Sequence, residues 1–381
     1  ILKGCHITNA GVNLRHEHES LFFIYFDEKL FIFAKGEFYR NTSHLKHYNF
    51  FLPMQTFSLD RFFGKSNRFY FMGIAIIMIF FFHLDTHYAD TFATNAPAWL
   101  RVFDQGYLGV DIFFILSSFG LTISLDKYTE KPDYKQFYLN RFRRIYPYYI
   151  CYLILLSLSF LYVLDKTMTI RLFSDNLLCL SLFLDSPETA LIHVDWYTQS
   201  ILLLYLFFPL VFQLNKRISS KKFTIEALFL LLLILIARLP IYTQSQYLFI
   251  SRWPVIFLAS VTYFHLKQND YATIIKLSLL SILVGSLLFN LYLLLSLGVF
   301  AVVLLICSAD ITLPFNKVFS FLGKHSYEIY LAQNVWTYYF IHTKRFDSPY
   351  ILTTICLVGT IITAIVIYFA GKVLSKLFPK N

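Results

Sequence analysis

Long, almost uninterrupted apolar segments are the feature that most limits what this chain can fold into. Two of them, EALFLLLLILIA from Glu226 and LYLLLSLGVFAVVLLICSA from Leu291, contain a single charged side chain between them. A helix of about 20 such residues crosses the roughly 30 Å hydrocarbon layer of a bilayer. Water-soluble domains have about a quarter of their residues charged, whereas here the charged share is 15% and the hydrophobic share 57%. The sequence therefore predicts an all-α integral membrane protein.

Apolar stretches predict about ten membrane-spanning helices, and the basic residues predict their direction. Lys and Arg gather in the 125–144 loop, around 216–222 and near the C-terminus. Cytoplasmic loops are enriched in these residues, so we place all three segments and both termini in the cytoplasm. This requires that the more polar segment 171–185 does not cross the membrane. The predicted spans are 69–87, 106–124, 145–164, 194–213, 223–238, 250–266, 272–287, 291–308, 321–341 and 350–370.

The net charge and the cysteines add little to this class assignment. The charge of +10 is what the basic cytoplasmic loops of a membrane protein produce, and we expect no nucleic-acid partner. The five cysteines show no CxxC or paired spacing, which favours packing roles over disulfides or metal ligands.

Residues 1–67 differ from the rest of the chain. They mix charged, histidine and aromatic residues without a sustained period and contain no apolar segment long enough to span. We predict an N-terminal extension over 1–67 and a transmembrane domain over 68–381. Met54, just ahead of the first span, is one candidate for the true start, and a genuine small extension is the alternative.

Two ionisable side chains fall inside predicted spans. His83 ends the run GIAIIMIFFFH, about 15 Å of helical rise above Gly73, and Asp111 enters the second span in GYLGVDIFFILSSFG. Such groups usually face a protein interior or a water-filled cavity, and a carboxylate that orients an imidazole makes a general base. We predict that the two lie at similar depth and act together. The alternatives are an interfacial histidine and an aspartate that caps its helix.

At GVDIFFILSSF the sequence resembles the signature GVD-hydrophobic-FF-x-LSGF of the acyltransferase-3 family, integral membrane enzymes that O-acylate sugars. FYLNRFRRIYPYY, WYTQSILLLYLFFPL and FLGKHSYEIYLAQ resemble further motifs of that family in the same order. The segment GIAIIMIFFFH is similar to its first-helix motif, which ends on the family's essential histidine. The resemblance covers roughly residues 68–370.

This resemblance implies a reaction and its participants. The donor is acyl-CoA, most simply acetyl-CoA, bound as a co-substrate with no permanent cofactor. The acceptor is a hydroxyl of a cell-surface or exported glycan or glycolipid, and the location is a bacterial cytoplasmic membrane. His83 is the expected base and Asp111 its partner. Guanidinium groups suit phosphate oxygens, so the expected acyl-CoA residues are Arg68, Arg141, Arg143 and Arg144. For Arg141, Arg143 and Arg144 the alternative is that they only set the topology. Around the reacting groups and acceptor we expect Ser117, Trp196, Arg252 and Tyr327.

Several positions depart from the family pattern. Met72 stands where the family usually has an arginine, eleven residues before the histidine. Arg68, one turn earlier on the same helical face, could take its place. Ser118 replaces the glycine of LSGF, and Gln333 replaces the final histidine. Two other functions therefore stay open: a catalytically inactive homologue, and a transporter or flippase, for which paired broken helices would be expected.

Overall fold

The chain divides into two units, Ile1–Thr56 and Phe57–Asn381. In the first unit, β1 (Phe22–Phe26) pairs antiparallel with β2 (Lys29–Phe33). The regular elements described in the second unit are all helices. The computed structural model describes residues 22–26, 29–33, 65–92, 97–127, 132–163, 169–184, 196–219, 223–241, 244–308, 313–342 and 348–377.

Within the described residues, each stretch predicted to span the membrane lies mainly on one helix, although 321–341 is divided between two helices that meet at His325. The longer helices are α2 (Lys65–Phe92), α4 (Leu108–Asp126), α5 (Tyr134–Val163), α8 (Trp196–Ile218), α9 (Phe223–Ile236), α11 (Trp253–Lys267), α12 (Tyr271–Leu287), α13 (Leu291–Ser308), α14 (Asn316–Lys324), α15 (Ser326–His342) and α16 (Pro349–Ser375). The shorter ones are α3 (Ala98–Arg101), α6 (Ile170–Leu177), α7 (Ser181–Leu184) and α10 (Gln244–Ile250).

Fewer than ten of the described helices meet the length and composition requirements of a membrane span. Within the described residues, three further helices are apolar but shorter, and a 17-residue helix such as α12 rises only about 26 Å. Helices α6 and α7, with 8 and 4 residues, are too short to cross, in agreement with the placement of 171–185. The count of ten spans and the location of the termini stay predictions. The five helices long and apolar enough to cross cover Asn67–Ala89, Leu108–Asp126, Trp196–Ile218, Gln246–Lys267 and Pro349–Ser375.

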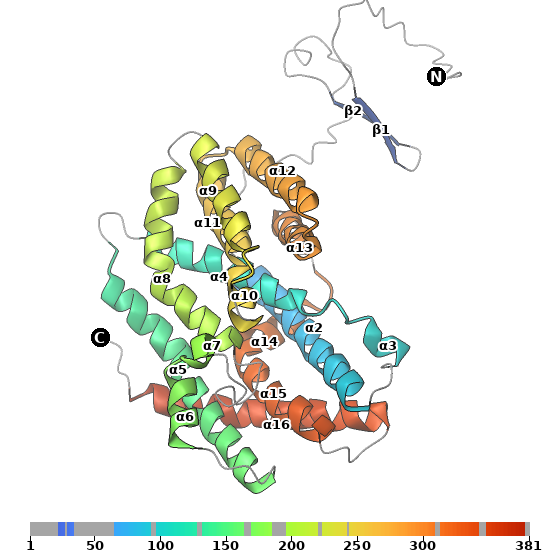
Figure 1. The fold of residues 1–381 in the computed structure, drawn as a ribbon, viewed down its shortest axis with the longest axis vertical. Helices are drawn as coiled ribbons and strands as arrows, with labels where there is room; N and C mark the ends of the chain where they lie inside the picture. Colours follow the sequence, from blue (N-terminus) through green and yellow to red (C-terminus); the bar gives the residue numbers. More distant parts are fainter. Residues whose placement is uncertain are drawn as a thin grey trace, which may run out of the picture. The chain divides into compact units, whose positions relative to one another are not determined.

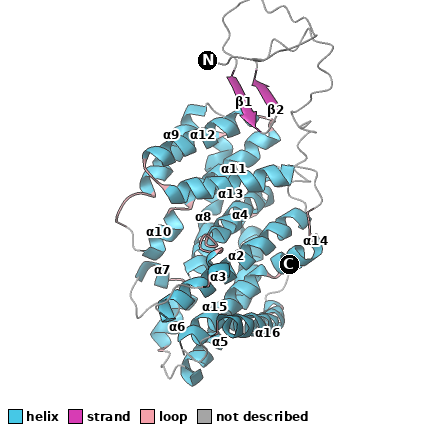
Figure 2. Cartoon of the chain, turned by 90° about the vertical axis from the view of Figure 1, so that its right-hand side faces the viewer, coloured by secondary structure: helices cyan, strands magenta, loops and turns pink. Residues whose placement is uncertain are grey.

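Helices α4 and α11 form the centre of the bundle. In α4, and in the Gln246–Lys267 stretch that contains α11, 78% of the most apolar window is buried, compared with 33% in α16. Helix α2 packs against α4, α14 and α15, while α16 lies along α15 and α5 (Figure 1). In the turned view of Figure 2, α2 and α4 lie between α11 on one side and α15 with α16 on the other.

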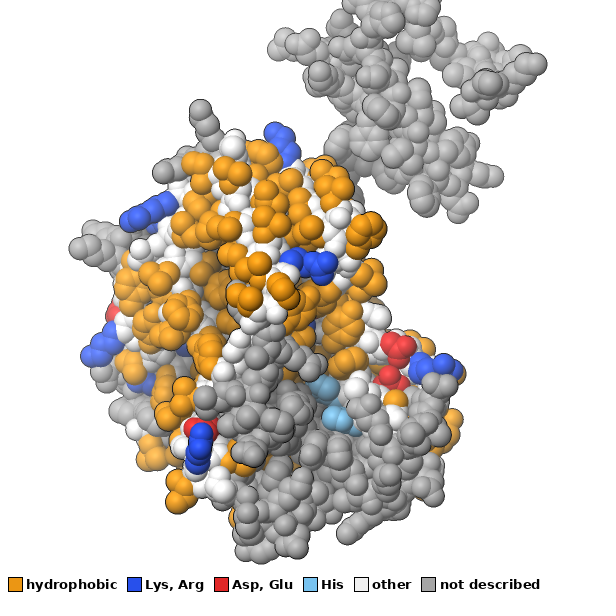
Figure 3. Space-filling view, viewed as in Figure 1, with side chains coloured by type: hydrophobic (Ala, Val, Ile, Leu, Met, Phe, Trp, Pro, Cys, Tyr) orange, Lys and Arg blue, Asp and Glu red, His pale blue; other side chains and the backbone are white. Residues whose placement is uncertain are grey.

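Exposed apolar side chains cover the outside of this bundle. On α16, Ile361, Ile362, Ile365 and Phe369 are each more than half exposed. Hydrophobic side chains also cover much of the face shown in Figure 3, over α9 and α12. Water-soluble proteins rarely expose apolar surface on this scale. On helices of this composition, the surface is suited to contact with lipid.

Candidate functional site

Two glycines, Gly106 just before α4 and Gly109 in its first turn, set the register of α4 against α2. An added Cβ at Gly106 would collide with the carbonyl oxygen of Met78, and one at Gly109 would collide with that of Ala75. The two helices therefore run antiparallel, and Asp111 lies beyond the level of Ala75. His83 is eight residues away in the other direction along α2, which is about 12 Å of rise. The prediction that His83 and Asp111 share a depth is corrected by this register.

His83 instead lies beside a glutamine from α15. Its Nδ1 is 3.3 Å from the side-chain Nε2 of Gln333, and Gln333 has no exposed surface. One turn further along α2, the ring of His87 stacks on that of His83 at a centroid distance of 6.3 Å. Sequence reasoning noted Gln333 only as a departure from the family pattern. Its place at the end of the IYLAQ motif was the available signal.

Asp111 belongs to a different group of buried side chains. It accepts a hydrogen bond from the Tyr292 hydroxyl, and its Oδ1 lies 3.8 Å from the Nε of Arg252. The guanidinium of Arg252 sits over the rings of Trp196 at 5.0 Å and Tyr292 at 4.6 Å. Asp111 and Arg252 are 0% and 2% exposed. Asp111, Trp196, Arg252 and Tyr292 thus form a packed latch that joins α4, α8 and α13 to the start of α11.

Three of the four arginines expected to bind the donor come together, from α2 and α5. Arg68 packs its guanidinium against Gly120 of α4 and lies within electrostatic range of Arg141 and Arg144. The guanidinium of Arg141 lies 5.7 Å from the ring centroid of Tyr205 on α8. We call Arg68, Arg141 and Arg144 the arginine cluster. The fourth arginine, at position 143, is partly buried on α5.

The arginine cluster is short of negative charge. Among the described residues, none of its three guanidinium groups forms an ion pair, and the Nε atoms of Arg68 and Arg141 are buried without a hydrogen-bond partner. Burial lowers the pKa of Arg141, while Arg144 is exposed. Glu328 is the acidic group that the structure places near Arg144. Burying unpaired charge is costly, so this cluster suits an anionic ligand.

A series of buried tyrosines leads from the arginine cluster towards His83. Arg68 lies near Tyr197, whose ring centroid is 5.0 Å from that of Tyr330. Tyr330 is one turn before Gln333 on α15, and Tyr327 is partly buried near Tyr197. From Arg68 to His83 the rise along α2 is about 22 Å. These tyrosines connect the two ends of that distance through the interior of the bundle.

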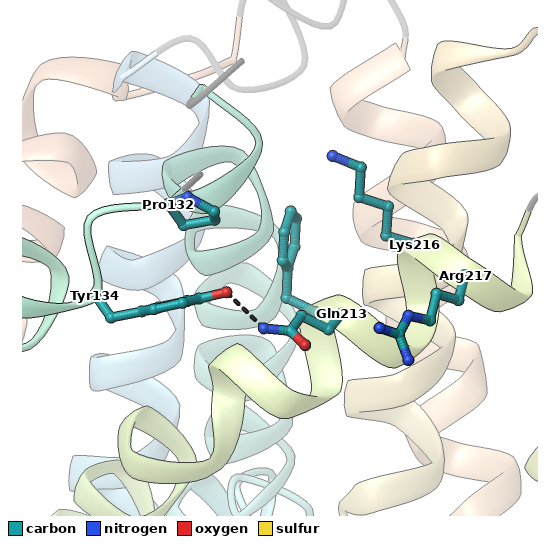
Figure 4. Close-up of a pocket in the computed structure, with 6 residues that line it drawn as sticks. Pro132, Tyr134, Gln213, Lys216 and Arg217 are labelled. Atoms are coloured by element: carbon teal, nitrogen blue, oxygen red, sulfur yellow. Dashed lines mark hydrogen bonds between the residues drawn. The ribbon is translucent and has the colours of Figure 1, made fainter. Parts of the chain in front are cut away.

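A shallow pocket of about 210 Å³ lies where α5 begins and α8 ends. Figure 4 shows the Gln213 amide of α8 donating a hydrogen bond to the Tyr134 hydroxyl of α5, at 2.6 Å. Lys216 and Arg217 extend from the last turn of α8 beside it. The pocket therefore combines an aromatic wall with two cationic side chains.

Two other expectations concern α4 and metal binding. Ser117 is partly buried on α4, and no hydrogen bond joins it to His83 in the described part of the chain. Within the same residues, no group of three or more His, Cys, Asp or Glu side chains is placed to hold a metal ion.

Comparison with known proteins identifies one similarity. A family model described as an acyltransferase domain, that of the acyltransferase-3 family, matches residues 70–369. Searches of curated proteins and of solved structures found no match. The matched range contains the His83–Gln333 pair, the latch and two of the three residues of the arginine cluster.

Proposed function

Since this chain belongs to the acyltransferase-3 family, whose model covers residues 70–369, we propose that it moves an acyl group from acyl-CoA to a glycan hydroxyl. Acetyl-CoA is the simplest donor. The acceptor is a cell-surface or exported glycan or glycolipid, and the protein works in a bacterial cytoplasmic membrane. Membership of the family supports the acyl transfer, and the membrane-spanning helices support the location in a bilayer.

The arginine cluster is the observation that carries the choice of donor. CoA bears several phosphate charges, and guanidinium groups bind phosphate oxygens through charge-assisted hydrogen bonds. Arg68 and Arg141 have buried Nε atoms without a partner, and no carboxylate forms an ion pair with either among the described residues. A phosphate would supply the negative charge that the protein itself does not provide there.

The pocket between α5 and α8 gives the donor a way in. Tyr134 precedes Arg141 by seven residues on α5, and Phe212 follows Tyr205 by seven on α8. Both helices therefore lead from the pocket to the Arg141–Tyr205 contact in about two turns, roughly 10 Å. The basic loops predict that this end faces the cytoplasm, where acyl-CoA is found. We assign the pocket to the nucleotide end of the donor.

The uncharged pantetheine arm then reaches the reacting groups past the buried tyrosines. Tyr197, Tyr327 and Tyr330 line the interval between the arginine cluster and His83. A thin, uncharged arm can enter this interior, whereas the phosphates stay at the arginines because moving charge into low dielectric is costly. The thioester is thereby delivered to a histidine that lies on the far side of the bundle.

His83 provides the base for the transfer. A sugar hydroxyl attacks poorly unless its proton is removed as the new bond forms. In our proposal His83 takes that proton, the hydroxyl oxygen bonds to the thioester carbonyl carbon, and the carbon–sulfur bond breaks. The leaving thiolate then receives the proton from His83, which balances the reaction. A two-step route through an acyl-histidine uses the same residue.

The donor assignment can be tested on purified protein in nanodiscs. Acetyl-CoA should stabilise the wild type against thermal unfolding, because a ligand that binds only the folded state adds about 2.7 kcal/mol at 100 times its Kd. Arg141→Ala should weaken that stabilisation at equal ligand concentration. The exposed Arg238, whose guanidinium donates to the Leu288 carbonyl, serves as the control in Arg238→Ala. Equal responses from Arg141→Ala and the wild type would contradict the proposal.

The transfer itself is tested on the surface glycans of cells. Surface glycans from cells with and without the gene should differ by the mass of an acetyl group, and His83→Ala should remove that difference. A His83→Ala protein that still acetylates would exclude this residue as the base. A wild type that binds acetyl-CoA but modifies no glycan would favour an inactive homologue.

A further inference from the structure

The contact between His83 and Gln333 bears directly on which nitrogen of the imidazole can act. A neutral imidazole carries one proton, so that one ring nitrogen donates and the other accepts. The partner at Nδ1 therefore decides whether Nε2 has a free lone pair. For His83 that partner is the side-chain amide of Gln333, 3.3 Å away and fully buried.

The two possible orientations of this amide have opposite consequences for catalysis. With Nε2 of Gln333 towards the ring, Nδ1 of His83 accepts and the ring proton sits on its own Nε2, which then cannot take a proton from an alcohol. The Oε1 of Gln333 then points away from the ring and makes no hydrogen bond to His83. A half-turn of the terminal amide exchanges the two atoms without changing its shape. The carbonyl oxygen then accepts from Nδ1–H, and Nε2 of His83 is free.

We propose that Gln333 is a positioning residue whose carbonyl oxygen holds His83 in the tautomer with a free Nε2. This inference rests on the proposed function, because it assumes that His83 is the base. It assigns to an uncharged amide the orienting role that the sequence had given to Asp111. Asp111 cannot fill it, since the register of α4 places this carboxylate in the latch with Arg252.

The surroundings of His83 leave Gln333 as the group best placed for this task. His87, on the same helix, is the titratable side chain within electrostatic range of His83 in the described structure. Its ring stacks on that of His83 at a centroid distance of 6.3 Å. From α15, the helix packed against this part of α2, the contact is made by the amide of Gln333, which carries no charge.

Two substitutions separate positioning from mere packing. Gln333→Met keeps the length of the side chain but removes the acceptor. By analogy with the partners that orient metal-bound histidines, it should lower kcat by about 10- to 100-fold. The KM for acetyl-CoA and the amount of folded protein should not change. Gln333→Glu restores an acceptor and should recover activity. Its carboxylate favours the protonated imidazole, so the acidic limb of the kcat profile should move to higher pH.

A matched control shows what the loss of a buried glutamine does when that glutamine lies away from His83. Gln199 on α8 is 1% exposed and its Oε1 accepts a hydrogen bond from the backbone N–H of Leu182. Gln199→Met should leave the pH profile unchanged, whatever it does to stability. The proposal is overturned if Gln333→Met keeps the wild-type kcat and pH profile, or if Gln333→Glu fails to recover activity in folded protein.

A spectroscopic measurement tests this inference without relying on catalytic turnover. Nitrogen-15 spectra of histidine-labelled protein, with His83 assigned by difference from His83→Gln, report which ring nitrogen carries the proton. We expect the proton on Nδ1 in the wild type and a mixture of tautomers in Gln333→Met. A wild-type proton on Nε2 refutes the role of Gln333 even if glycans are acetylated. Conversely, a proton on Nδ1 in a protein without transferase activity refutes the proposed function alone.

Discussion

Replacing Arg252 with alanine should destabilise the folded protein strongly, rather than weaken substrate binding alone. Arg252 and Asp111 are 2% and 0% exposed, so solvent does not screen the pair. Removing one partner of a buried ion pair costs about 3–5 kcal/mol because the other charge is left uncompensated. Arg252→Ala also removes contacts with the rings of Trp196 and Tyr292, each worth about 0.5–2 kcal/mol. We count these contacts as part of the loss of about 3–5 kcal/mol and do not add them to it. We expect the free energy of unfolding to fall by about 3–5 kcal/mol.

The assay is equilibrium unfolding in mixed micelles, followed by tryptophan fluorescence. It compares Arg252→Ala, the single variants Asp111→Leu and Arg252→Met, and the double variant that combines the last two. Asp111→Leu combined with Arg252→Met leaves no buried charge, so the double variant should lose much less than the sum of the single losses. The pair Arg171–Asp175, whose arginine is 82% exposed although its aspartate side chain is only 12% exposed, provides the control, and Arg171→Ala should change stability by no more than about 1 kcal/mol because solvent screens the guanidinium. The reasoning is refuted if Arg252→Ala loses less than about 1 kcal/mol, or if the losses in the double variant simply add.

Two further predictions concern packing and pH. Gly73→Val should destabilise the protein by about 3 kcal/mol or more, at the upper end for overpacking, because the added Cβ would meet the Phe319 backbone of α14; thermal unfolding and expression would show it, and a folded variant of normal stability would contradict it. Asp270→Ala should cost about 1 kcal/mol at neutral pH, since Asp270 caps α12 through the Thr273 N–H. That hydrogen bond, assisted by His265, lowers the pKa of Asp270 below its usual 3.8, so the difference between wild type and variant should persist above pH 3.8 and vanish as the pH falls below the folded value. A difference that grows on acidification would have the wrong sign.

The fold class could be predicted because it depends on local composition. In a bilayer no water is present to form hydrogen bonds with the backbone N–H and C=O groups of an apolar run such as that of α13, so the run must form a helix. The number of crossings depends on more than composition. Helix α9 is highly apolar over Phe223–Ile236, yet its 14 residues rise only about 21 Å. The segment 321–341 is divided at His325 into α14 and α15, a division that apolar periodicity alone does not reveal.

The partners of the candidate site residues could be predicted only in part. The motifs pointed to His83, Asp111 and the arginines, but the contact made by each depends on the relative axial position of two helices. Gly106 and Gly109 set that position through close approach to the backbone of α2. A shift of one turn would change it by about 5.4 Å. Sequence spacing within one helix contains no such information, which is why Asp111 was expected beside His83.

The buried arginines show how structure separates two roles that look alike in sequence. Arg252 has an acidic partner in Asp111, so its charge is compensated whether or not a ligand is present. Arg68 and Arg141 have buried Nε atoms without partners, and no ion pair within the described residues. A fold that keeps such charges uncompensated gives up stability in the free protein. An anion bound there would restore that stability, so under the proposed function we expect these two arginines, rather than Arg252, to contact the phosphates of acyl-CoA.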